Sequence, residues 1–350
     1  MSQNNIGTEI ADQIIADFTA LASEAKRKNA EVKHACDHSI ELTLPFSTSS
    51  SRPLNELEKQ LGFQKTARKH PEYITPIIMA CNSKNSKLIG LAIKLLSKFI
   101  QLQILPDCDS VSDESSDPFG SIVDALLNAS NSTPEVQIKL LQLLPILMQM
   151  YAFRINDEIL CNTLYICSNL QSVNRTPIII NTAQATFSQM LDIVFEKLDS
   201  EEGRDIANDL KYEVTLDDKK TTKINQFCFD AQRIVSDLCT LIEHHKPSFL
   251  KTNYISEDYG FEILEGILKN NSDVFINHEE LTYLLRTRII PILLRFLSSS
   301  KDFTLMVKVS RIILLVLEKQ FEVLKIESEV TLNMLTHILS KDSGALMWKK

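Results

Sequence analysis

The stretch EELTYLLRTRIIPILLRFL, residues 279–297, decides the fold class of this chain. Its large apolar side chains recur every three or four residues, and this spacing places them on one face of an α-helix. The aligned residues are Leu281, Leu285, Ile289, Ile292 and Phe296. We therefore predict one amphipathic helix over 279–297 that is buried along a single stripe.

The same spacing recurs along the rest of the chain. It predicts helices over residues 8–25, 29–44, 54–67, 71–81, 84–105, 118–129, 134–151, 157–169, 177–198, 223–244, 258–269, 303–320 and 325–339. Only 8 of the 350 residues are glycine, against about 7% in ordinary globular chains. Amphipathic helices joined by short turns, without a strict sequence period, are typical of degenerate armadillo- or HEAT-like repeats. The predicted fold class is all-α, an α-solenoid of stacked helix hairpins.

Length and charge predict more than one domain. A chain of 350 residues exceeds the roughly 250–300 residues at which a single core stops growing. Asp107–Asp117 holds five carboxylates and no base, and Asp199–Thr222 holds eight carboxylates against four bases. The second segment is the better boundary, so we predict a helical domain over 1–200, a charged linker over 199–222 and a second helical domain over 223–350. A further helix that starts near Ala345 meets no stop signal, so we expect a fragment of a longer protein.

Composition limits the partners and the cellular environment that this chain is expected to have. The net charge of −8 argues against nucleic acid as a partner, because binding to phosphates needs a basic face. Seven scattered cysteines are typical of reduced core thiols in a cytosolic protein. Since no apolar run approaches the about 18 residues of a membrane span, any membrane contact is expected to be peripheral.

No catalytic motif is present, so we predict no catalytic residue, no cofactor and no metal site. The sequence lacks a phosphate-binding glycine loop, a nucleophile elbow and a dinucleotide fingerprint. His34, Cys36 and His38 suggest metal ligands, yet on a helix the two histidines share a face and Cys36 points to the opposite side. A site with the two histidines alone stays open beside the simpler interpretation as surface histidines.

The strongest positive feature is a basic cluster at a predicted turn between two helices. It consists of Lys26, Arg27, Lys28 and Lys33, with His34 beside them. Such a cluster can contact an anionic membrane or an acidic partner, at about 1 kcal/mol per base. The alternative is a solvated helix end, where basic side chains favour the helix dipole.

Several blocks of sequence resemble a known family. Residues 17–40 (DFTALASEAKRKNAEVKHACDHSI), 75–96 (TPIIMACNSKNSKLIGLAIKLL) and 181–198 (NTAQATFSQMLDIVFEKL) resemble the dimerization and cyclophilin-binding (DCB) domain of the Mon-two family of Golgi scaffolds, called Ysl-two in yeasts. Residues 230–242 (DAQRIVSDLCTLI) and 260–297 resemble the start of its HUS domain, named for homology upstream of the Sec-seven catalytic module. The asparagine-tyrosine-aspartate signature of the HUS box is absent from the chain.

The resemblance implies a function that composition does not. It implies a large cytoplasmic protein, peripheral on trans-Golgi and endosomal membranes, that is related to Arf guanine-nucleotide exchange factors but lacks their catalytic module. The implied work is non-enzymatic scaffolding of traffic between these compartments. The implied partners are an Arf-like small GTPase, a Dopey-type protein, an aminophospholipid flippase, an anionic Golgi membrane and a second copy bound through the DCB region. The alternatives are the regulatory N-terminal region of an active Arf exchange factor and a generic helical-repeat transport adaptor.

Overall fold

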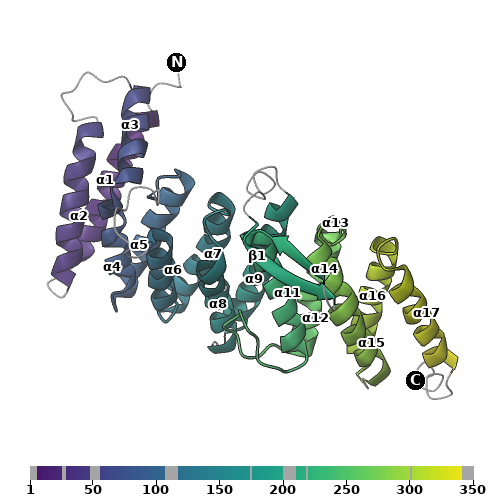
Figure 1. Ribbon diagram of the computed structural model, residues 1–350. Coiled ribbons are helices and arrows are strands. Elements are labelled where there is room, and N and C mark those ends of the chain that lie inside the picture. Colours follow the sequence, from purple (N-terminus) through teal and green to yellow (C-terminus); the bar gives the residue numbers. More distant parts are fainter. Residues whose placement is uncertain are drawn as a thin grey trace. The chain divides into compact units, whose positions relative to one another are not determined.

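The described part of the chain is almost entirely helical. The computed structural model describes residues 6–25, 29–47, 56–106, 117–173, 176–199, 210–217, 220–299 and 302–340. Over these residues helices alternate with short connections, and one pair of short strands interrupts them (Figure 1). The prediction of an all-α fold is confirmed. The chain divides into two compact units, Met1–Phe187 and Ser188–Lys350, with the division inside one helix.

Unit 1 is a series of helices in which neighbours along the chain pack on one another. Helix α1 packs against α2, α3 and α5, helix α5 against α4 and α7, and helix α6 against α4 and α8. Packing between helices that are mostly one or two places apart along the chain is the pattern expected of helical repeats. The elements are α1 (Ile6–Glu24), α2 (Ala30–Thr43), α3 (Glu56–Lys69), α4 (Thr75–Cys81), α5 (Ser86–Gln101), α6 (Pro118–Ala129), α7 (Pro134–Met150), α8 (Asp157–Val173) and the first part of α9 (Pro177–Asp199).

Helix α5 shows why the sequence forms these elements. Its N-cap residue is Asn85, whose side chain accepts hydrogen bonds from the backbone N–H groups of Lys87 and Leu88, which satisfies two of the unpaired donors at a helix start. Its apolar stripe is fully buried, and the ring of Phe99 packs edge-on against Phe18 of α1 with 6.0 Å between centroids. The cap therefore fixes where α5 begins, and the stripe fixes which face turns inward.

Unit 2 repeats this arrangement and adds the strands. Helix α11 packs against α12 and α14, helix α12 against α16, and helix α15 against α16 and α17. The elements are the remainder of α9, β1 (Tyr212–Asp217), β2 (Lys220–Ile224), α11 (Gln226–Ile242), α12 (Glu257–Asn270), α13 (Ser272–Asn277), α14 (Glu279–Leu284), α15 (Ile290–Ser299), α16 (Phe303–Lys319) and α17 (Lys325–Ser340).

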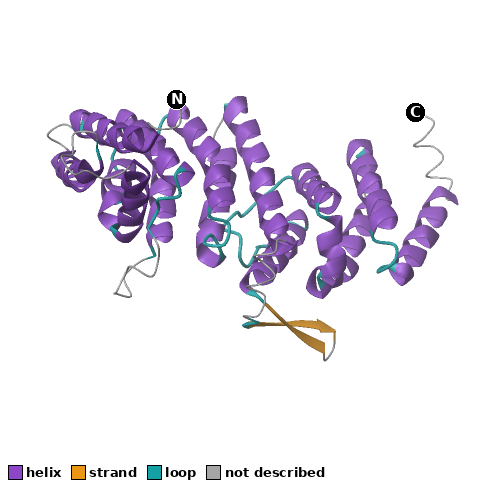
Figure 2. Cartoon of the chain, turned by 90° about the horizontal axis from the view of Figure 1, so that it is seen from above, coloured by secondary structure: helices purple, strands orange, loops and turns teal. Residues whose placement is uncertain are grey.

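The strands are a departure from the sequence prediction. They form one antiparallel hairpin with Tyr212 opposite Ile224 (Figure 2), where we predicted the end of a linker and the start of a helix. Apolar and polar residues alternate in β1, and its Leu216 is buried, so the period of two that defines a half-buried strand is present. The acidic character of the segment concealed this alternation. The following helix consequently begins at Gln226 instead of Lys223.

The deciding stretch 279–297 departs from prediction in two respects: Phe296, the last aligned residue, is only half-buried, and the helix is interrupted by a π-helical turn. The four aligned residues from Leu281 to Ile292 are buried as predicted, but the helix passes through a π-helical turn at Leu285–Ile289, where the Ile290 N–H bonds to the Leu285 carbonyl five residues back. Pro291 explains the turn. Its nitrogen has no hydrogen, and its ring would collide with the carbonyl four residues earlier in a regular α-helix.

Several sequence predictions lie outside the described residues. These are the basic residues Lys26, Arg27 and Lys28, most of the acidic segment Asp107–Asp117, residues 200–209 and 218–219 of the linker, and the helix expected from Ala345. Among the described helices, none is both long enough and apolar enough to cross a membrane. The six cysteines in the described ranges are all buried.

Candidate functional site

The predicted basic cluster is represented in the structure by one of its four residues. Lys33 lies in the first turn of α2 with its side chain exposed, and the neighbouring His34 is also exposed. Lys26, Arg27 and Lys28 lie outside the described residues. The structure therefore places Lys33 on an accessible surface and leaves the clustering of the four bases as a prediction.

The residues His34, Cys36 and His38 do not converge. Cys36 is fully buried under α2, while both histidines are exposed. Burial, and next the nearby charge of Asp37, raises the pKa of the Cys36 thiol to about 12. The thiol therefore stays protonated inside the core and does not share a site with the two histidines.

The first candidate site is a groove in unit 1, which we call the α5–α7 groove. Its volume is about 690 Å³. The buried side chains of Ile93, Val136 and Leu143 form part of its floor, and exposed lysines stand at its rim. The groove is lined by Glu24, Ser86, Lys87, Gly90, Leu91, Ile93, Lys94, Ser97, Lys98, Thr133, Glu135, Val136, Lys139, Gln142, Leu143 and Ile146.

Three of the four lysines at the rim have acidic neighbours. Lys98 is paired with Asp17 of α1, and the Nζ atom of Lys94 lies 3.6 Å from the same carboxylate. The Nζ atom of Lys139 lies 2.8 Å from Glu135 one turn earlier. Because these pairs are partly exposed, each contributes little to stability. The α5–α7 groove thus offers an apolar floor and edges on which the four lysines outnumber the carboxylates of Asp17, Glu24 and Glu135, a combination suited to a segment that carries apolar and acidic side chains.

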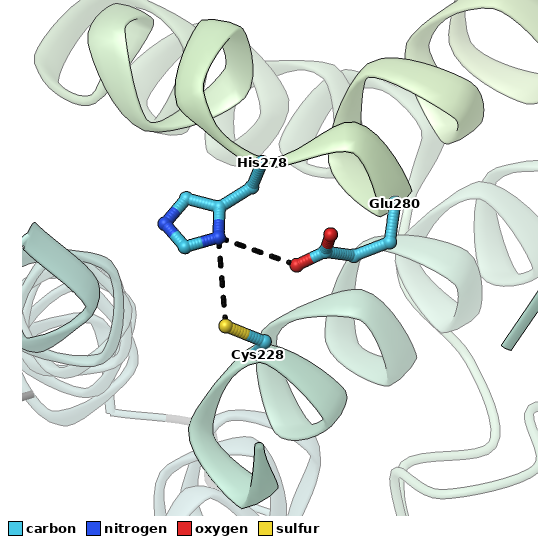
Figure 3. Close-up of side chains that lie close together, drawn as sticks. All are labelled: Cys228, His278 and Glu280. Atoms are coloured by element: carbon cyan, nitrogen blue, oxygen red, sulfur yellow. Dashed lines mark hydrogen bonds and ion pairs between the residues drawn. The ribbon is translucent and has the colours of Figure 1, made fainter. Parts of the chain in front are cut away.

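The second candidate site lies in unit 2, where three side chains with metal-binding atoms meet (Figure 3). They are Cys228 in the first turn of α11, His278 directly before α14 and Glu280 in the first turn of α14. The Cys228 Sγ atom lies 3.5 Å from His278 Nδ1, and His278 Nδ1 lies 3.3 Å from Glu280 Oε1. We call these residues the Cys–His–Glu cluster.

Local sequence explains how these side chains are positioned. The side chain of Asn225 caps α11 by accepting the backbone N–H of Cys228, which fixes the first turn of that helix. His278 ends α13 and starts α14, where its carbonyl accepts the N–H of Thr282. The following residue, Glu279, contacts Lys220 and Thr222 of β2. The hairpin and both helix starts therefore meet around the Cys–His–Glu cluster.

Burial shapes the protonation of this cluster. Cys228 and Glu280 are buried, whereas the His278 side chain retains 19% of its exposure. Burial, and then the negative charge of Glu280, raises the pKa of the Cys228 thiol to about 12. Without a cation nearby, the thiol is therefore protonated at neutral pH.

Sequence reasoning missed this cluster because its members are 50 residues apart. The only local signal was the triplet His278-Glu279-Glu280, in which alternate residues carry an imidazole and a carboxylate. A histidine and an acid two residues apart are common without any site, so the pattern predicted nothing until the fold placed Cys228 beside it.

Comparison with known families matches both parts of the chain. Residues 6–202 match the Mon2/Sec7/BIG1-like dimerisation and cyclophilin-binding domain. Residues 227–350 match the Mon2/Sec7/BIG1-like HUS domain.

Individual relatives agree with these matches. The chain is 32% identical over 347 residues to Protein MON2 of Saccharomyces cerevisiae, a match that covers 97% of the chain and 20% of that relative. It is 22% identical to the Homo sapiens Protein MON2 homolog, over 95% of the chain and 20% of that protein. It is 20% identical over 210 residues to the Brefeldin A-inhibited guanine nucleotide-exchange protein 1 of Rattus norvegicus, which covers 57% of the chain and 11% of the relative.

The chain spans about a fifth of the length of the MON2 proteins that it matches. The DCB match alone covers more than half of the chain, and the HUS match follows it in the order that the resemblance predicted. The sequence blocks that resemble the DCB and HUS domains lie within these two matches, and the all-helical fold agrees with them. The chain therefore belongs to the Mon2/Sec7/BIG1-like family.

Proposed function

We propose that this chain is a non-catalytic scaffold region for protein traffic between the trans-Golgi and endosomes. The observation that carries the proposal is the match to MON2 proteins over 97% of the chain, through its DCB and HUS domains. In this proposal, residues 1–200 and 223–350 act as helical domains joined by the linker 199–222. The protein works in the cytoplasm, peripherally on trans-Golgi and endosomal membranes.

The scaffold acts by offering helical surface to partners. The proposed partners are an Arf-like small GTPase, a Dopey-type protein and an aminophospholipid flippase, together with a second copy bound through the DCB region. The description of the DCB domain as a dimerisation domain supports the second copy. The α5–α7 groove supplies the docking surface in unit 1, because its apolar floor and lysine rim suit an apolar and acidic segment.

The docking proposal is tested by pull-downs of the 350-residue chain with Arf-like GTPases in both nucleotide states. We expect GTP-dependent capture that weakens when Lys87 and Lys139 at the groove rim are both changed to Glu, because the rim then repels an acidic segment. The matched control changes Lys246 and Lys269 to Glu, which are exposed in unit 2. Equal weakening in both variants contradicts a role for the groove. Absence of capture by any GTPase removes that partner.

Self-association is tested separately by multi-angle light scattering of the same chain. A dimer whose mass is insensitive to the groove variant supports a second copy bound elsewhere in the DCB region. A monomer at all accessible concentrations contradicts self-association of this chain.

The membrane part of the proposal rests on the basic cluster Lys26, Arg27, Lys28 and Lys33. We expect binding to anionic vesicles, and we expect the triple change of Lys26, Arg27 and Lys28 to Ala to reduce it by a loss of about 1 kcal/mol per base. The control replaces Lys246, Lys269 and Lys319 with Ala, which are exposed in unit 2. Sedimentation with liposomes measures the effect, and unchanged binding of the triple variant contradicts the proposal.

One observation favours a second function, the regulatory N-terminal region of an active Arf exchange factor. The chain is 20% identical over 57% of its length to a rat guanine nucleotide-exchange protein. A nucleotide-exchange assay of the full-length protein on an Arf-type GTPase separates the two functions. Exchange activity favours regulation of an enzyme, and its absence with retained docking favours the scaffold.

A further inference from the structure

The Cys–His–Glu cluster has the dimensions of a tetrahedral zinc site. Zinc binds sulfur at about 2.3 Å, imidazole nitrogen at about 2.0–2.1 Å and carboxylate oxygen at about 2.0–2.2 Å. In a tetrahedron these bonds separate sulfur from nitrogen by about 3.6 Å and nitrogen from oxygen by about 3.4 Å. The observed separations are 3.5 Å between Cys228 Sγ and His278 Nδ1 and 3.3 Å between His278 Nδ1 and Glu280 Oε1. Both separations match those of ligands that share one zinc ion, and the three ligand atoms lie within 4.8 Å of one another.

A second observation concerns the Glu280 carboxylate. Its Oε1 atom is buried and lies 3.3 Å from the imidazole nitrogen without a hydrogen bond of ordinary geometry to it, while the Cys228 thiol interacts with the same carboxylate group. Burying a carboxylate is costly unless its charge is compensated, and a cation at this position supplies that compensation. An oxygen and a nitrogen that are this close without a proper hydrogen bond between them are arranged as two ligands are around a shared ion.

Charge and ligand type identify the metal. A thiolate and a carboxylate carry two negative charges, so a divalent cation makes the buried cluster neutral. Sulfur and imidazole ligands disfavour Mg²⁺ and Ca²⁺, which prefer oxygen, and the set of Cys, His and Glu suits Zn²⁺. The partly exposed side chain of His278 marks the side from which an ion reaches the site.

We propose that Cys228 Sγ, His278 Nδ1 and Glu280 Oε1 bind one Zn²⁺, with the fourth position open to water or to an incoming ligand. On binding, the thiol releases its proton to solvent and its sulfur forms a bond with the metal, and nothing is oxidised or reduced. The metal joins the start of α11 to the start of α14. Since Glu279 holds the hairpin through Lys220, the bound metal also steadies the attachment of β2.

The alternative for these three residues is a metal-free hydrogen-bonded network. In that case the Cys228 thiol and the His278 imidazole bond to each other, and the position of the imidazole hydrogen decides which group donates. The two arrangements differ in what they predict for added metal, so one experiment separates them.

The experiment uses the 350-residue chain stripped of metal with a chelator and then titrated with Co²⁺ and Zn²⁺. Co²⁺ replaces Zn²⁺ in tetrahedral sites, and a thiolate ligand adds a strong sulfur-to-cobalt absorption band. We expect one equivalent of Co²⁺ to produce this band, Zn²⁺ to remove it, and Zn²⁺ to raise the melting temperature. No thiolate band, with no change in melting temperature, overturns the proposal.

Variants assign the band to the cluster. We expect the band to disappear in Cys228→Ser and to persist in Cys239→Ser, a buried cysteine of the same helix outside the cluster. Removing a residue that only hydrogen-bonds to a metal ligand typically lowers metal affinity by about 10- to 100-fold. We expect His278→Gln to lower the zinc affinity by more than this, because His278 binds the metal directly. The control is His245→Gln, an exposed histidine in the same unit.

The outcomes remain distinct if one variant does not fold. His278 is partly exposed, so His278→Gln keeps the test available when Cys228→Ser is unstable. Full zinc affinity in His278→Gln overturns the proposal, as does a full thiolate band in folded Cys228→Ser. None of these outcomes depends on the proposed scaffold function.

Discussion

At the scale of single residues, Lys197 carries the clearest physical consequence. The side chain of this lysine in α9 is almost fully buried, and its Nζ atom lies 4.7 Å from the centre of the Phe227 ring. Burial lowers its pKa from 10.5 to about 8, and the charge of Asp230 partly opposes this shift. A buried ammonium that gives up its proton this early makes the stability of unit 2 depend on pH.

We predict that Lys197 makes the folded chain more stable as the pH rises from 8 to 10. In this range the folded lysine is largely neutral while the unfolded one still binds a proton, so the unfolded state holds more protons and stability increases with pH. The gain over two pH units is about 2 kcal/mol. Urea unfolding of wild type and Lys197→Met at several pH values measures it as the difference between the two proteins.

The control for this prediction is Lys269→Met, an exposed lysine at the end of α12. Its pH dependence should follow that of the wild type. A stability difference between wild type and Lys197→Met that is constant from pH 8 to pH 10 contradicts the lowered pKa.

The buried stripe of residues 281–292 and the buried Lys197 show what sequence patterns can and cannot predict. The stripe from Leu281 to Ile292 was predictable, because helical spacing alone determines which side chains turn inward. Lys197 was not, since a lysine among apolar neighbours in a helix usually reaches solvent with its charged end. Only the fold places Asp230 and Phe227 beside it, and the same limit hid Cys228 from His278 and Glu280.

At the scale of elements, the contact between α11 and α12 depends on the absence of one side chain. A Cβ atom added at Gly260 of α12 would lie 2.6 Å from Ile242 Cγ1 and 3.0 Å from Ile255 Cδ1. Such distances force the surrounding core to move. Gly266, on the same helix, has open space where its Cβ atom would be.

We predict opposite effects for the same substitution at these two glycines. Gly260→Ala should destabilise unit 2 by about 1–3 kcal/mol, because the added methyl overpacks the α11–α12 contact. Gly266→Ala should stabilise it by about 0.5–1 kcal/mol, because alanine is the better helix former and meets no neighbour. Chemical denaturation of the two variants compares them directly. Stabilisation by both substitutions would contradict the close approach at Gly260.

The elements also show where the sequence prediction lost accuracy. The helices were predicted because their period of 3.6 persists over many residues. The hairpin was missed because β1 and β2 are short, and because charged residues between apolar ones suggested a linker. The π-helical turn before Pro291 was missed because it does not change the identity of the buried residues at Leu281, Leu285 and Ile289.

At the scale of the whole molecule, the buried cysteines can show when each of the two units unfolds. Cys36, Cys81, Cys161 and Cys167 lie in unit 1, and Cys228 and Cys239 lie in unit 2. Burial raises the pKa of Cys36, Cys81, Cys228 and Cys239 to about 12 and also raises that of Cys167. Thiolates are the reactive form, so these side chains react slowly until the unit that holds them opens.

We predict that thiol labelling during urea unfolding follows the two units separately by mass spectrometry. In Gly260→Ala, Cys228 and Cys239 should become reactive at a lower urea concentration than in the wild type, because that variant weakens unit 2. The cysteines of unit 1 serve as the internal reference. Labelling of Cys228 or Cys239 in the native chain at the rate of a free thiol would contradict their burial.

The π-helical turn between α14 and α15 joins two parts of one stretch that pack against different neighbours. In a regular α-helix, one extra residue rotates everything after it by about 100° around the helix axis, but the wider π-helical turn absorbs that residue. The part before the turn faces α11 and the hairpin, and the part after it faces α16 and α17. Deleting one residue within 285–289 would therefore leave the two apolar faces facing their partners, but it would force a tight α-helical turn against the Pro291 ring, so the π-helical turn admits the proline without redirecting the rest of unit 2.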